Sequence, residues 1–140
     1  MQQYFDYNQK MAVPDKLFTP LHGVKLTGGL FRQMFDNNWK FNLTQLDIDR
    51  MRYWFDIKEG KEPTAERYPG HFEDNLHGQT ASQYLMAAGN TLRWEEIPEV
   101  RKGLETVLDF IEEGQEIDGF CLPIDKHDFA VREYPHYVRI

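Results

Sequence analysis

The sequence has only one cysteine, Cys121, among its 140 residues. A single thiol cannot form a disulfide within the chain, and no CxxC pair or Cys/His set has the spacing of a zinc site. We therefore predict no metal site in this chain and interpret Cys121, between Phe120 and Leu122, as a buried structural cysteine. The first eleven residues lack the apolar centre of a signal peptide, which favours a cytoplasmic location.

No stripe of basic residues is present either: 16 Lys and Arg are scattered among 23 Asp and Glu, and the net charge is −7. Nucleic acid and anionic membrane surfaces are therefore poor partners for this chain. The stretch with the fewest charges, residues 75–92, contains Asn, His, Gln, Thr and Ser and is too polar to span a bilayer. Hydrophobic residues make up 41% and aromatic residues 14%, so the chain can bury a core and disorder is not expected.

The chain begins with an extended lead-in, residues 1–27. Pro14 and Pro20 discourage helix there, and residues 24–26 have the composition of a short strand. A glycine pair then gives a turn signal, so the helical region is predicted to start at residue 28. The two predicted regions are therefore residues 1–27 and residues 28–140.

Helical periodicity dominates the second region. Apolar residues at helical spacing predict helices at residues 30–43 and 48–55, and Asp47 is a suitable N-cap for the second. Residues 59–70 hold two glycines and two prolines, which predicts a loop. A one-sided helix is predicted to begin at Pro98, in the first-turn position that proline favours. Its predicted apolar stripe is Val100, Leu104, Val107, Leu108 and Ile111.

A helix of different character is predicted just before it, at residues 75–92. This stretch contains no Asp, Glu, Lys or Arg, and apolar and small residues occur nearly all round the helix. Such a helix needs cover on most sides, and Asp74 or Asn75 is its predicted N-cap. An all-round buried helix followed by a one-sided helix is the repeating unit of an α/α toroid. A compact bundle and a short helical array are the alternatives.

The last part of the chain predicts a tight turn at Asp118 and Gly119, an extended segment at residues 120–123, and a new helix that starts at Pro135. The sequence stops five residues after this proline. Because only the first turn of that helix is present, we expect residues 28–140 to be an incomplete toroid segment. The predicted fold class is all-α, with the first helical hairpins of an (α/α)6 toroid.

Five short motifs, in the same order, resemble the catalytic domain of glycoside hydrolase family 127, the β-L-arabinofuranosidases. The longest is Gly-Gln-Thr-Ala-Ser-Gln-Tyr-Leu-Met-Ala at residues 78–87, where the family often has Gly-His-Thr-x-Gly-His-Tyr-Leu-Ser-Ala. The other four are an entry segment at residues 20–29, Leu-Asp-Ile-Asp-Arg at 46–50, Gln-Glu-Ile-Asp-Gly-Phe at 115–120, and Pro-His-Tyr at 135–137. The resemblance covers about residues 20–140.

This resemblance implies a toroid that holds sugar in its lumen and hydrolyses terminal β-L-arabinofuranosides or related sugars. It also implies a zinc-bound cysteine nucleophile and a glutamate acid/base, both from later repeats of the family. No position of this chain matches those groups, so we assign no catalytic residue, and expect zinc and the carbohydrate substrate only in a longer protein. Gln79 and Gln83 stand where the family motif has histidines, which changes the polar groups on the lumen side.

Four residues around the start of the uncharged helix form the predicted substrate-binding set: Asp74, His77, Gln79 and Gln83. Gln79 and Gln83 are four apart and share a helix face, from which two amides can hydrogen-bond sugar hydroxyls. Loops at the mouth of a toroid gather binding groups, which favours Asp74 and His77. The alternatives are a buried amide pair satisfied by neighbouring helices and an acid that only caps the helix.

Trp39, Trp54 and Trp94 are rings of the kind that stack on sugars, but packing in the core or in a groove is the prediction for each. Two other hypotheses remain for the whole chain. One is a small non-enzymatic helical interaction module, and the other is a different toroidal sugar enzyme, such as an unsaturated uronyl hydrolase or a sugar epimerase. An incomplete toroid is expected to expose an apolar edge and to oligomerise through it, whereas a module is expected to be a soluble monomer or dimer.

Overall fold

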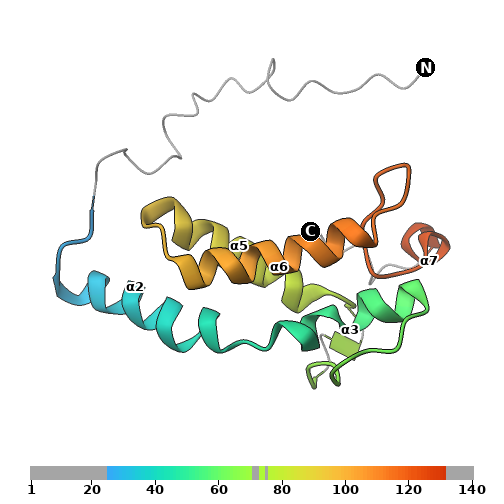
Figure 1. Ribbon diagram of the computed structural model, residues 1–140, viewed down its shortest axis with the longest axis horizontal. Coiled ribbons are helices and arrows are strands. Elements are labelled where there is room, and N and C mark those ends of the chain that lie inside the picture. The colour runs from blue at the N-terminus through green and yellow to red at the C-terminus, as the bar shows by residue number, and fades with distance from the viewer. Residues whose placement is uncertain (1–24, 71–72, 75, 132–140) are drawn as a thin grey trace, which may run out of the picture.

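The computed structural model describes residues 25–70, 73–74 and 76–131 (Figure 1). Its elements, in order, are α2 (Gly29–Phe41), the 3-10 helix η2 (Leu43–Gln45), α3 (Ile48–Glu59), α5 (Gln79–Trp94), α6 (Pro98–Glu113) and α7 (Lys126–Val131). All regular structure in these residues is helical, so the all-α prediction is confirmed for them. The short strand predicted at residues 24–26 is wrong for Lys25 and Leu26, which belong to no regular element.

Local sequence explains where α3 begins and ends. The Asp47 side chain accepts a hydrogen bond from the backbone N–H of Asp49 at 3.0 Å, as expected of an N-cap. The helix ends at Gly60, whose φ of 71° is the left-handed conformation that suits a helix C-cap. The loop predicted at residues 59–70 follows α3. Before α3, the helix predicted at residues 30–43 is confirmed as α2 followed by η2.

The two longest helices, α5 and α6, form an antiparallel hairpin joined by residues 95–97 (Figure 1). Pro98 lies in the first turn of α6, as predicted, where its missing N–H costs no helical hydrogen bond. The buried Gly103 of α6 lies against Tyr84 of α5, and a Cβ added to this glycine would lie 2.0 Å from the tyrosine oxygen. The hairpin therefore depends on a glycine at its contact surface.

The core lies where α3, α5 and α6 meet. Its largest fully buried side chains are Met51 of α3 and Val100, Val107 and Phe110 of α6. The ring of Phe55, also from α3, lies with its centroid 4.9 Å from that of Phe110. Removal of this apolar surface from water is the main force that holds α3 against the hairpin.

The predicted apolar stripe of α6 is only partly right. Val100, Val107 and Ile111 are buried as predicted, but Leu108 is 44% exposed. The remaining buried positions are Gly103 and Phe110. Because α6 packs against both α3 and α5, its buried face includes Gly103 and Phe110 and excludes Leu108.

The predicted start of the helix at residues 75–92 is wrong. The helix begins at Gln79, after Gly78 as N-cap, rather than at residue 75. Gln83, Met86 and Asn90 form an exposed row, with Met86 65% exposed, so one face of the helix is uncovered, as expected of an incomplete toroid segment. The helices described here cover α5 from one side, through buried residues such as Tyr84, and leave the opposite side open.

Several smaller predictions can be compared with the described residues. Trp39 is partly buried against the core, as predicted, and Cys121 is a free thiol that packs against the core but is only partly buried. The predicted cap Asn75 and helix start Pro135, with most of the lead-in, lie outside the described residues. Within the described parts of the chain, no helix has the length and hydropathy needed to cross a membrane.

Candidate functional site

The start of α5 is fixed by Gly78. Its φ of 80° lies in the left-handed region, which favours glycine. A Cβ added there would lie 2.6 Å from Cγ of Pro123 and 3.4 Å from Cε2 of Phe55. Both the backbone conformation and the lack of space therefore require glycine where α5 begins.

Glu73 supplies the side-chain cap of α5. Its side chain is buried, and one carboxylate oxygen accepts a hydrogen bond from the backbone N–H of Thr80 at 2.8 Å and another from the Thr80 hydroxyl. A carboxylate at this position also compensates the positive end of the helix dipole. The capping role predicted for Asp74 therefore belongs to Glu73, while Asp74 is exposed and forms an ion pair with Arg67.

His77 lies flat on the ring of Trp54. Their centroids are 3.6 Å apart and their planes differ by 10°, and Tyr53 meets Trp54 edge-on at 5.0 Å. Since Trp54 belongs to α3, this stack ties the segment before α5 to a different helix. Sequence reasoning assigned Trp54 to packing and missed its partnership with His77, because the two residues are far apart along the chain.

Two buried polar atoms in this region make no hydrogen bond with the described residues: Nε1 of Trp54 and Oε1 of Gln79. The first is a donor and the second is an acceptor. Buried polar groups are nearly always hydrogen-bonded in proteins. Any hydrogen-bond partner of these two atoms therefore lies outside the described residues, in water, in another part of the protein or in a bound ligand.

The four predicted site residues do not form one group. His77 and Gln79 lie together at the start of α5, with Trp54 stacked on His77. Gln83 lies one turn further along the helix and is exposed, while Asp74 is held by its ion pair outside the helix. The site that the geometry supports at this end therefore consists of Trp54, His77 and Gln79, with Gln83 beside it.

The Leu-Asp-Ile-Asp-Arg segment at the start of α3 holds the loop that leads to this site. The Arg50 guanidinium donates hydrogen bonds to the carbonyl oxygens of Glu66 and Arg67, both at 3.0 Å, and lies 4.8 Å from the centre of the Tyr68 ring. The Tyr68 hydroxyl in turn contacts the backbone of Asp47, donating to its carbonyl at 3.1 Å and accepting from its N–H at 2.6 Å. Arg50 is therefore a positioning residue for the loop.

The predicted tight turn at Asp118 and Gly119 is confirmed. Gly119 has a φ of 89°, and the Asp118 side chain accepts a hydrogen bond from the backbone N–H of Phe120 at 3.2 Å. The ammonium groups of Lys58 and Lys126 lie 4.7 and 5.3 Å from the centre of the Phe120 ring. Lys126 also lowers the pKa of Asp118 through a direct hydrogen bond. These contacts hold the segment that covers the start of α5.

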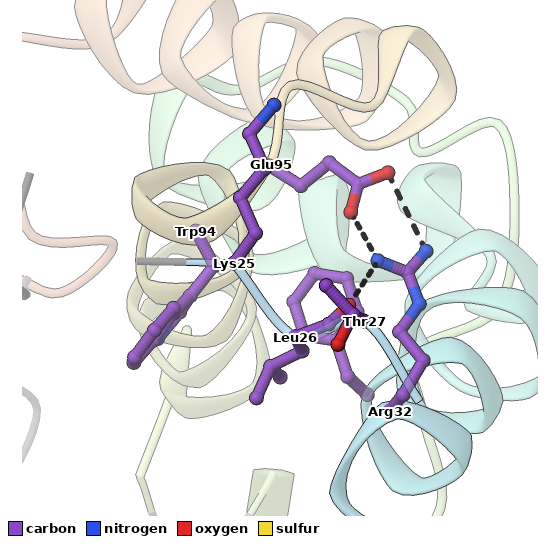
Figure 2. Close-up of a pocket in the computed structure, with 7 residues that line it drawn as sticks. Lys25, Leu26, Thr27, Arg32, Trp94 and Glu95 are labelled. Carbon is purple, nitrogen blue, oxygen red and sulfur yellow. Dashed lines mark hydrogen bonds and ion pairs between the residues drawn. The ribbon is translucent and has the colours of Figure 1, made fainter. Parts of the chain in front are cut away.

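A pocket of about 340 Å³ lies at the opposite end of α5 (Figure 2). Figure 2 shows the Glu95 carboxylate facing the Arg32 guanidinium, which donates to Oε2 of Glu95 at 2.5 Å and to the Leu26 carbonyl at 3.4 Å. Arg32 also pairs with Asp36 at 2.9 Å and lowers the pKa of that carboxyl. The lining residues are Lys25, Leu26, Thr27, Arg32, Phe35, Trp94 and Glu95.

Comparison with known families gives a match over most of this chain. A family model described as the catalytic domain of β-L-arabinofuranosidase in glycoside hydrolase family 127 matches residues 23–136. The chain belongs to glycoside hydrolase family 127. No curated protein and no solved structure matches it. The family resemblance drawn from the sequence motifs is therefore confirmed over most of the chain.

The structure shows what the family 127 motif at residues 78–87 does in this chain. Gly78 allows the close approach of Pro123, and Tyr84 packs over Gly103. The backbone N–H of Thr80 donates a hydrogen bond to the capping carboxylate of Glu73. Of the two glutamines in the motif, Gln83 is exposed, and Oε1 of Gln79 is buried with no hydrogen-bond partner among the described residues. Among the residues described by the structure, no cluster of three or more His, Cys, Asp and Glu side chains is arranged to hold a metal ion.

Proposed function

We propose that this family 127 chain is the N-terminal part of a glycoside hydrolase that acts on terminal L-arabinofuranosyl or related sugars. The observation that carries the proposal is the family match over residues 23–136. The proposal assigns the chain a sugar-binding and structural role, as one wall of a lumen. The catalytic glutamate and the zinc-binding cysteines would come from later repeats.

The start of α5 supports the binding role. Its donor, Nε1 of Trp54, and its acceptor, Oε1 of Gln79, have no hydrogen-bond partner among the described residues, and sugar hydroxyls both donate and accept. The neighbouring His77 ring is held flat by Trp54, so its orientation is fixed before a ligand arrives. Gln83, on the same helix face, would extend the polar surface by one turn.

The apolar surface of α2 supports the toroid arrangement. None of its residues is buried, and four large apolar side chains are strongly exposed: Leu30, Phe31, Met34 and Phe41. Met86 adds an exposed apolar side chain on α5. Soluble proteins rarely leave apolar patches of this kind uncovered. In a longer protein, further helical hairpins would cover the exposed faces of α2 and α5. Without those hairpins, copies of this chain would associate through the same faces.

A binding titration tests the proposed site. We expect methyl β-L-arabinofuranoside to shift the NMR signals of the Trp54 indole and the Gln79 side-chain amide. The Gln79→Ala variant should weaken binding by about 3- to 10-fold, the usual value of one neutral hydrogen bond. Gln33→Ala, which removes an exposed glutamine from α2, is the matched control and should leave affinity unchanged.

A hydrolysis assay tests the rest of the proposal. The chain alone should not cleave an aryl β-L-arabinofuranoside, while the same chain extended by later helical hairpins should do so in a zinc-dependent manner. Turnover by the 140-residue chain itself would contradict the assignment of catalysis to later repeats. Equal affinity of Gln79→Ala and Gln33→Ala for the sugar would contradict the site.

A further inference from the structure

The pocket at the end of α5 is distant from the proposed site. α5 has 16 residues, so its two ends are about 24 Å apart at 1.5 Å per residue. His77 and Gln79 lie at its N-terminal end, whereas Trp94 and the C-cap Glu95 lie at its C-terminal end. A ligand in this pocket would therefore occupy a second place on the chain, independent of the first.

The charged groups in and beside the pocket balance one another. The Arg32 guanidinium lies between two carboxylates, with bonds to Glu95 at 2.5 Å and to Asp36 at 2.9 Å. Lys25 adds one positive charge to the lining. The lining holds two cations and one anion, and Asp36, which pairs with Arg32 from outside the lining, brings the sum to zero. The pocket and its flanking carboxylate together therefore give no net attraction to a phosphate, a carboxylate or an amine.

The remaining lining combines an exposed ring with polar edges. Trp94 is 43% exposed, although large aromatic side chains are usually buried, and Leu26 and Phe35 extend the apolar wall. The Thr27 hydroxyl donates and accepts, and the Lys25 ammonium donates. A ligand that fits this lining has apolar C–H faces, hydroxyl groups at its edges and no charge.

We propose that this pocket binds one unit of a neutral saccharide, with the sugar ring against Trp94 and its hydroxyls on Thr27, Lys25 and the Arg32–Glu95 pair. Its volume of about 340 Å³ is at the small end of the range for ligand pockets, roughly 300–1,000 Å³, which suits a single unit. This site goes beyond the proposed function, since it needs neither the residues at the start of α5 nor any catalytic group.

An NMR titration with methyl β-L-arabinofuranoside tests the proposal, with inorganic phosphate as the charged probe. We expect the sugar to shift the backbone amides of residues 25–27 and the Trp94 indole, with saturation on the order of millimolar. Phosphate should cause no such shift in the wild-type chain. Trp94→Ala should weaken sugar binding by about fivefold or more, and Trp94→Leu repeats the test with apolar bulk but no flat ring if the first variant does not fold.

Two further variants separate this site from the first and test the charge argument. Gln79→Ala should leave the shifts at residues 25–27 intact even if it abolishes those at the start of α5, so the two proposals fail separately. Glu95→Gln removes one negative charge, and phosphate should then shift the same amides. Absence of a saturable sugar response, unchanged sugar affinity in both Trp94 variants, phosphate binding by wild type, or no response of Glu95→Gln to phosphate would each overturn the proposal.

Discussion

Replacement of Gly103 by alanine is expected to destabilise the protein, although alanine is the better helix former. In the middle of an exposed helix the change from glycine to alanine would stabilise by about 0.5–1 kcal/mol. In α6, however, the new Cβ would lie 2.0 Å from Oη of Tyr84 and 3.3 Å from Cδ1 of Ile48. Tyr84 is 3% exposed and packed in the core, so it has little room to move away.

The magnitude follows from the two opposing effects. Overpacking of a dense core usually costs about 1–3 kcal/mol, which exceeds the helix-forming gain. The net loss of unfolding free energy for Gly103→Ala is therefore about 1–2 kcal/mol. Urea unfolding followed by far-UV circular dichroism measures it. Gly89→Ala in α5 is the matched control, because nothing lies within 4 Å of its added Cβ and it should stabilise slightly.

A double-mutant cycle identifies the cause of the loss. Tyr84→Phe removes the oxygen that the new methyl group meets, and the next atom of that ring, Cζ, is 3.2 Å away. Gly103→Ala should therefore cost at least about 1 kcal/mol less in the Tyr84→Phe background than in the wild type. The packing argument is refuted if Gly103→Ala stabilises as Gly89→Ala does, or if Tyr84→Phe leaves its cost unchanged.

Three other perturbations have defined outcomes. Gly78→Ala should cost about 2–4 kcal/mol in urea unfolding, because it combines a left-handed backbone with a clash against Pro123. Arg50→Ala should speed proteolysis of the loop between α3 and α5, because the loop carbonyls of Glu66 and Arg67 lose their guanidinium partner. Lys126 and Lys58 lower the pKa of Glu116 below 4.5, so this group stabilises the fold above that pH and the contribution is lost as pH falls through the lowered value. Lys126→Gln should therefore make unfolding less dependent on pH below about 4.5.

Each of these outcomes has a clear contrary result. A Gly78→Ala chain as stable as the wild type would show that the start of α5 tolerates a side chain. Equal cleavage rates in the loop of wild type and Arg50→Ala would remove the positioning role of Arg50, and Arg52→Ala, on the same helix, is the control for loss of an arginine. Identical acid unfolding curves for wild type and Lys126→Gln would show that the cation does not act on Glu116.

Local signals in the sequence were enough to place most of the helices. Asp47, Pro98 and the turn at Asp118 and Gly119 were predicted in the roles that the structure gives them. These signals work because caps, first-turn prolines and tight turns depend on hydrogen bonds and backbone angles within a few residues. The family was also predictable, because its motifs are short and occur in order.

The start of α5 was not predictable from local sequence. Asp74 was a reasonable cap by residue type, yet Glu73 takes that role and the helix begins at Gln79, with Gly78 as its N-cap. The decisive contact comes from Pro123, which leaves no room for a side chain at Gly78. Such a contact depends on where the chain returns after α6, and no pattern within residues 73–80 reports it.

The sequence by itself determined the helical character of the chain, the positions of α2, α3 and α6, and its membership of glycoside hydrolase family 127. Only the tertiary structure decided which side of α5 is covered, that Trp54 stacks on His77, and that Arg32 meets Glu95 beside the exposed Trp94. The physical reason is range: helix formation is set by interactions between residues three or four apart, whereas a site is set by side chains that distant helices bring together as they bury the core.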